Sequence, residues 1–149
     1  MNNVYEKGSM RIKGTGDITF NPDSAALRLE IDKAIAIARD QYEQDNNIKI
    51  GIYPFLEEKC NISQDTYKKI QSPKYKNKWT REMLGKLCVG LGMSIDEANE
   101  LFLLQGGKLN ETNALDKIIY CALRDKDNIY DFCEEVLEYT GRDIESFKK

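Results

Sequence analysis

The spacing of apolar side chains predicts a protein built mainly from α-helices. From residue 21 to about residue 45, apolar residues recur at intervals of three and four: Leu27, Ile31, Ala34, Ile35, Ala38 and Tyr42. Such spacing places them on one face of a long helix. Asn21 can cap this helix and Pro22 suits its first position. Residues 29–37 also fit the period of two that is typical of a strand, but the alanines between residues 25 and 38 favour helix.

Shorter helices follow, and local capping chemistry marks their ends. Ser63 and Thr80 can each accept a hydrogen bond from the first turn of the helix that follows. Ser94 and Glu97 have the spacing of a capping box. Asn61 tolerates the left-handed conformation that ends many helices. The predicted helices cover residues 54–60, 64–70, 80–91, 94–105, 113–125 and 128–140.

Two short segments favour a different local structure. Residues 11–20 surround a Gly-Thr-Gly turn with apolar residues, and residues 48–53 alternate three isoleucines with other residues. This alternation predicts a short strand pair or hairpin, although two strands alone are marginally stable. We therefore expect residues 1–20 to be a flexible start with a possible short strand. Residues 21–149 are expected to form a single helical domain.

Charge is distributed unevenly along this chain, whose net charge is −3. Residues 66–93 contain seven basic residues and one acidic residue, whereas residues 94–149 contain seven basic and thirteen acidic residues. A strongly basic segment inside an acidic protein is the pattern expected for contacts with phosphates. The alternative interpretation is a loop that only aids solubility.

Several classes of function lack their usual residues. The chain has no histidine, which removes the commonest general base and metal ligand. No phosphate-binding glycine motif or Cys-x-x-Cys pair is present. We therefore expect no enzyme activity and no cofactor or metal. The four cysteines are expected to be buried free thiols. No signal peptide or membrane span is apparent, so a cytoplasmic location is expected.

Residues 55–70, FLEEKCNISQDTYKKI, resemble the two-helix core of λ-repressor-like (XRE-type) helix-turn-helix domains. Leu56 takes the place of the family's buried leucine, and Ser63 that of the capping residue after the turn. The downstream stretch LGKLCVGLGMSIDEANELF resembles the fourth helix, glycine stop and fifth helix of that family. The resemblance covers roughly residues 52–105 and implies a helix-turn-helix bundle.

A closer likeness is to the degenerate helix-turn-helix modules appended to some bacterial macro-domain proteins. Those modules also have a basic, tyrosine-containing loop after the second helix, as in SPKYKNKW here, and two further helices at the end. One position departs from the family pattern. Glu57 stands where the family usually has a small residue, which suggests a looser helix crossing or an outward-turned side chain.

The resemblance also implies a set of DNA contacts. The second helix of such a motif enters the major groove by its N-terminal end. Matched by position, Gln64, Asp65 and Lys69 would face base edges, and Thr66 and Lys68 would lie beside the backbone. Phosphate contacts that set the register would come from the basic loop and the residue just after it. Those residues are Lys74, Lys76, Lys78 and Arg81.

Two classes of function follow from this sequence. The first is a DNA-binding transcriptional regulator, such as a repressor, phage regulator or antitoxin-like protein, which binds double-stranded DNA as a homodimer. The second is a protein-interaction module on the same fold, such as an anti-defence inhibitor, immunity protein or adaptor, which does not bind DNA. The acidic residues 94–149 favour the second, since they can imitate nucleic acid toward a basic partner. Binding of single-stranded RNA through Tyr75 and Trp79 is a third hypothesis.

Overall fold

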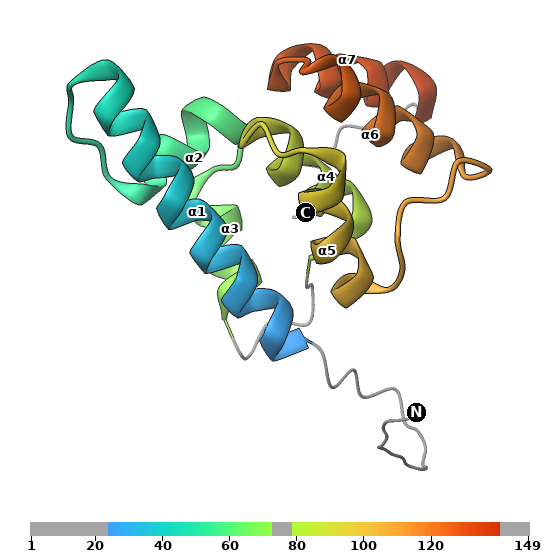
Figure 1. Cartoon of the computed structure of the whole chain (residues 1–149), viewed down its shortest axis with the longest axis horizontal. Coiled ribbons are helices and arrows are strands. Elements are labelled where there is room, and N and C mark those ends of the chain that lie inside the picture. The colour runs from blue at the N-terminus through green and yellow to red at the C-terminus, as the bar shows by residue number, and fades with distance from the viewer. Residues whose placement is uncertain (1–23, 73–78, 141–149) are drawn as a thin grey trace.

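A computed structural model of the chain describes residues 24–72 and 79–140. These residues form seven α-helices and no strand: α1 (Ser24–Asn46), α2 (Ile52–Cys60), α3 (Gln64–Gln71), α4 (Arg81–Gly90), α5 (Ile95–Gln105), α6 (Ala114–Asp125) and α7 (Ile129–Thr140). Figure 1 shows α4 and α5 between α1 on one side and the α6–α7 pair on the other. The prediction of a mainly helical fold is confirmed. In these two ranges, no helix has the length and apolar character needed to cross a bilayer.

Capping chemistry explains where the helices start and end. The side chains of Ser63, Thr80 and Asn113 each accept a hydrogen bond from a first-turn backbone N–H of α3, α4 and α6. At α5 both halves of the predicted capping box are present, between Ser94 and Glu97. Asn61 ends α2 in the left-handed conformation, with φ at 55°. The predicted helix boundaries therefore agree with the structure to within one or two residues at these ends.

The strand prediction for residues 48–53 is wrong. Residues 48–51 lie outside any helix or strand, while Ile52 and Tyr53 form the first turn of α2. Three alternating isoleucines are too short a pattern to outweigh the helix, and Pro54 fits its first turn because no backbone donor is needed there. The proposed partner strand in residues 11–20, and the flexible start at residues 1–10, lie outside the described residues.

Helix α4 is buried along most of its length. All residues from Met83 to Val89 are buried, including Lys86, which the sequence count had placed in the basic segment. Helices α2, α5, α6 and α7 pack against α4. A helix that is enclosed on all sides is the centre of the hydrophobic core. Lys86 therefore contributes nothing to a basic surface.

The approach of α4 to α2 is set by Gly90. A Cβ atom at Gly90 would lie 2.5 Å from the carbonyl oxygen of Lys59 and 2.6 Å from both the Cα and the Sγ of Cys60. Any side chain here would force the backbones of α4 and α2 apart. The free thiols of Cys60 and Cys88 are buried at this crossing. Burial raises the pKa of Cys60 to about 12, so this thiol stays neutral and packs as an apolar group.

We predict that Gly90→Ala destabilises the protein although alanine is the better helix former. The added methyl group must displace the backbone of α2, and overpacking of this kind costs about 1–3 kcal/mol. Urea unfolding measures the loss. Gly106→Ala is the matched control, since nothing lies within 4 Å of a Cβ at that position. Equal stability of the two variants would contradict the close approach.

Candidate functional site

Helices α2 and α3 meet at a tight turn of residues 61–63. The side chain of Ser63 caps α3 by accepting from the backbone N–H of Thr66 at 3.1 Å. Ile62 within the turn is fully buried and fixes the crossing of the two helices. The side chain of Glu57 is exposed, which is the outward-turned arrangement considered from the sequence.

Only part of α3 offers the side chains that DNA contact would require. Gln64, Asp65 and Lys68 are exposed. Thr66 is not: it is 0% exposed, and its hydroxyl oxygen accepts from Ser63 Oγ at 2.9 Å. The predicted role of Thr66 beside the DNA backbone is therefore wrong, because capping of α3 turns this hydroxyl inward. Lys69 is partly exposed, and its ammonium lies 3.4 Å from the carboxylate of Asp65.

Helix α1 covers one side of α3 through a polar network. Asp32 Oδ1 accepts from the Tyr67 hydroxyl at 3.2 Å and from Gln71 Nε2 at 3.1 Å. Arg28 donates to the backbone carbonyl of Gln71 at 3.2 Å. Burial and the neighbouring carboxylate of Asp32 raise the pKa of Tyr67 to about 12. Tyr67 belongs to the core, and α3 is held against α1 at its C-terminal end.

The basic segment is only partly described. Lys74, Tyr75, Lys76 and Lys78 lie outside the described residues. Trp79 follows them and is buried, with its ring edge-on to Tyr67 at a centroid distance of 6.4 Å. Trp79 therefore packs in the core and does not present the stacking surface that the hypothesis of single-stranded RNA binding requires.

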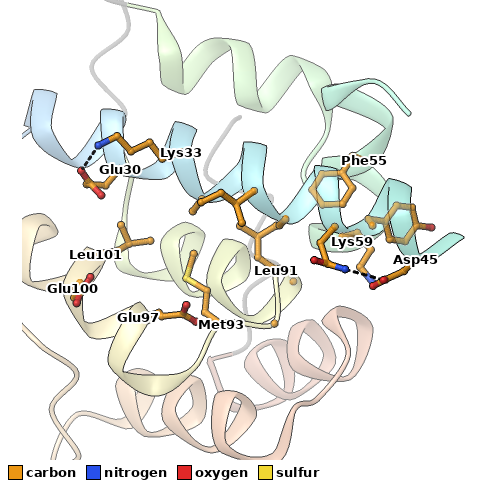
Figure 2. A pocket seen from close by; sticks show the side chains of 17 residues that line it. Glu30, Lys33, Asp45, Phe55, Lys59, Leu91, Met93, Glu97, Glu100 and Leu101 are labelled. Atoms are coloured by element: carbon orange, nitrogen blue, oxygen red, sulfur yellow. Dashed lines mark hydrogen bonds and ion pairs between the residues drawn. The ribbon is translucent and has the colours of Figure 1, made fainter. Parts of the chain in front are cut away.

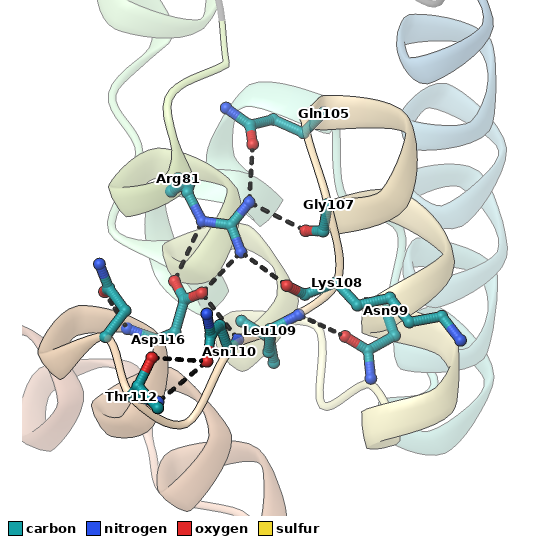
Figure 3. Close-up of polar contacts among 10 residues, drawn as sticks. Arg81, Asn99, Gln105, Gly107, Lys108, Leu109, Asn110, Thr112 and Asp116 are labelled. Carbon is teal, nitrogen blue, oxygen red and sulfur yellow. Dashed lines mark hydrogen bonds and ion pairs between the residues drawn. The ribbon is translucent and has the colours of Figure 1, made fainter.

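The N–H donors of Arg81 all bind other residues of the protein. Its Nε and Nη2 donate to the carboxylate oxygens of Asp116 at 3.0 and 2.7 Å. The other donors reach Gln105 Oε1 at 3.0 Å and the backbone carbonyls of Gly107 and Lys108 at 2.9 and 3.3 Å. Figure 3 shows that these partners surround the guanidinium group. All five N–H donors of an arginine are thereby occupied, so the predicted phosphate contact of Arg81 is wrong.

The same cluster attaches the C-terminal helices to the rest of the fold. Asp116, 3% exposed, also accepts from the backbone N–H of Asn110 at 2.9 Å. The guanidinium group of Arg81 lies over the ring of Phe102, 4.9 Å from its centroid. Gln105 donates in turn to the carbonyl of Trp79 at 3.2 Å. One arginine thus joins the start of α4, the end of α5 and the start of α6.

A pocket of about 590 Å³ lies on a different face of the molecule. We call it the α1–α5 pocket, because α1 forms one wall and the start of α5 forms part of the other (Figure 2). The end of α2 and the α4–α5 turn complete it. Its apolar lining consists of Ala34, Ile37, Ala38, Phe55, Leu91, Met93 and Leu101. Ile37 is 71% exposed although it is a large apolar residue.

Sequence reasoning missed this pocket. Ile37 was noted only in the rival strand pattern, and its position outside the helical stripe of α1 was the one signal that could have marked it. Much of the lining opposite α1 comes from residues more than 50 positions further along the chain, such as Leu91, Met93 and Leu101. At one end, the hydroxyl of Tyr42 donates to Glu58, and this hydrogen bond raises the pKa of Tyr42.

Comparison with known proteins assigns no function to the start of α3 or to the α1–α5 pocket. Comparison with protein-family profiles, curated proteins and solved structures gives no significant match. Across residues 24–72 and 79–140, no cluster of three or more histidine, cysteine or acidic side chains is arranged to hold a metal ion. The candidate surfaces are therefore the exposed start of α3 and the α1–α5 pocket.

We predict that Arg81→Ala acts on stability and not on phosphate binding. Removing the guanidinium leaves the buried carboxylate of Asp116 without its cation, and breaking a buried pair costs about 3–5 kcal/mol. Urea unfolding measures this loss. Arg124→Ala is the control, because Arg124 pairs with the neighbouring Asp125 and both are exposed; it should change stability by about 0.5 kcal/mol or less. Similar losses in both variants would contradict the structural role of Arg81.

Proposed function

We propose that this protein is a protein-interaction module that holds a segment of a partner protein in the α1–α5 pocket. The observation that carries the proposal is the open apolar lining of this pocket, with Ile37 71% exposed at its wall. A concave site with an apolar lining is typical of binding surfaces. The proposed role is binding and not catalysis.

The charges around α3 also favour a protein-interaction module over a DNA-binding protein. Affinity for DNA comes mainly from cations that neutralise phosphates. Arg81 is occupied by Asp116 and Lys86 is buried. Lys69 lies beside Asp65. Lys68 is exposed, and its ammonium lies over the ring of Tyr53, 5.5 Å from its centroid. The described part of the basic segment therefore offers much less positive surface than its sequence suggests.

A DNA-binding regulator is the second candidate. It is favoured by the Ser63 cap, which leaves Gln64 exposed at the start of α3, together with Lys68 one turn further on. An exposed helix start is the part of a λ-repressor-like motif that reads bases. In that role the protein would act as a two-fold dimer, and the loop residues Lys74, Lys76 and Lys78 would supply the phosphate contacts.

Site-specific photo-crosslinking tests the first proposal. We expect a benzophenone amino acid in place of Ile37 to form a discrete adduct with one protein in the source cells. Ala34→Arg, which fills the pocket, should abolish this adduct. The same photo-reactive residue in place of Leu103, which is 57% exposed and outside the pocket, is the control. Identical adducts from positions 37 and 103 would count against a pocket-specific partner.

Selection from random duplex DNA tests the second candidate. If the first proposal holds, the wild-type protein enriches no sequence and binds as weakly as Lys74→Ala/Lys76→Ala/Lys78→Ala. A regulator would instead enrich an operator, lose affinity with salt by several released counterions, and lose sequence preference in Gln64→Ala. That second result would replace the interaction module with a regulator.

A further inference from the structure

The α1–α5 pocket carries an excess of negative charge at its edges. Two cations are part of its lining, Lys33 and Lys59, whereas four carboxylates are: Glu30, Asp45, Glu97 and Glu100. Figure 2 shows that Glu30, Glu97 and Glu100 lie toward the end marked by Leu101, whereas Lys59 and Asp45 lie at the other end with Phe55. Lys33 lies beside Glu30 at the same end and pairs with it, so the net negative charge of this end comes from Glu97 and Glu100 in the first turns of α5.

Contacts within the protein already engage both cations. The ammonium of Lys33 lies 3.3 Å from the carboxylate of Glu30. Lys59 lies over the ring of Tyr42 at 5.3 Å from its centroid. Among the carboxylates, Glu97 accepts from the backbone N–H of Ser94 at 2.9 Å, and no cation among the described residues forms an ion pair with it. Glu100 has no partner among the described residues.

Between these charged edges the lining leaves space for apolar side chains of a ligand. Ala34 and Ala38 are one turn apart on α1, and their small side chains keep the wall low. Met93 and Leu101 are buried and form the opposite side. Ile37 projects from the same face of α1 and is 71% exposed. A pocket of this shape accepts the apolar face of a helix or extended peptide.

We infer that the pocket binds an amphipathic segment of a partner protein whose apolar residues are flanked by lysine or arginine. Its apolar side chains lie between Ala34 and Met93, and its cations lie against Glu97 and Glu100. Charge complementarity of this kind sets the orientation and the choice of partner. A second copy of this chain fits less well, since a two-fold contact would place the same acidic edge on both sides. The inference rests on the proposed interaction function.

The test uses the full chain with ¹³C-methyl-labelled methionines and two synthetic helices. One helix is made of leucine and lysine at amphipathic spacing, and the other has glutamate in place of lysine. We expect the leucine–lysine helix to shift the Met93 methyl signal in a saturable manner while Met83, buried in α4 and outside the pocket, is unchanged. The leucine–glutamate helix should leave both signals in place. Equal binding of the two helices would overturn the inference.

Two matched pairs of variants locate the contact. Glu100→Lys should weaken binding of the leucine–lysine helix roughly fivefold, since an exposed attraction becomes a repulsion. Glu111→Lys makes the same change of charge outside the pocket and should have no effect beyond the small one of net charge. Ile37→Asp should remove most of the binding, and Leu103→Asp should not. Indistinguishable effects within either pair would overturn the proposed site.

The outcomes also separate this inference from the proposed function. A crosslinked partner from position 37 together with no preference for the cationic helix would keep the interaction function and overturn the inferred chemistry. If neither a crosslinked partner nor a preference for the cationic helix is found, both the proposed function and the inferred chemistry are wrong. A shift of the Met93 signal on Ile12→Asp in the protein without added peptide would show that the chain's own residues 10–13, Met-Arg-Ile-Lys, occupy the pocket. That result would likewise overturn assignment of the site to a partner.

Discussion

Enclosure of α4 is the constraint on which the rest of the structure depends. Four helices pack against it, and the residues from Met83 to Val89 are all buried. At one end of α4, Gly90 permits contact with the backbone of α2. At the other end, Arg81 holds the α5–α6 connection and Asp116. Both candidate surfaces depend on the Gly90 end, because α2, which Gly90 contacts, leads into α3 and the α4–α5 turn after Gly90 lines the pocket.

Local chemistry made most of the helices predictable. An N-cap such as Ser63 or Thr80 acts within three residues of itself, so its effect can be read without knowledge of the fold. The same holds for the left-handed Asn61. The strand at residues 48–53 failed for a related reason: a pattern of three alternating residues carries little information. What decided that segment was the helix start around Pro54.

The candidate site was much less predictable, because its contacts join distant parts of the chain. Arg81 and Asp116 are 35 residues apart, and nothing in the basic segment shows that one of its cations has an internal partner. Thr66 has a polar side chain, yet capping by Ser63 turns it into the core. The pocket combines α1 with residues of α2, α4 and α5, so it exists only after folding. The exposure of Gln64 and Lys68 was predictable, because it depends only on their positions around helix α3.

The close approach at Gly90 also has a consequence for evolutionary comparison. A position where any Cβ would meet the backbone of another helix is constrained by packing, whatever happens to the surface. Glycine at this position, an arginine nine residues before it and an aspartate thirty-five residues after that arginine form a sparse fingerprint. Substitution at any of these three positions disturbs a contact between helices, so they should tolerate less change than exposed positions such as Gln64.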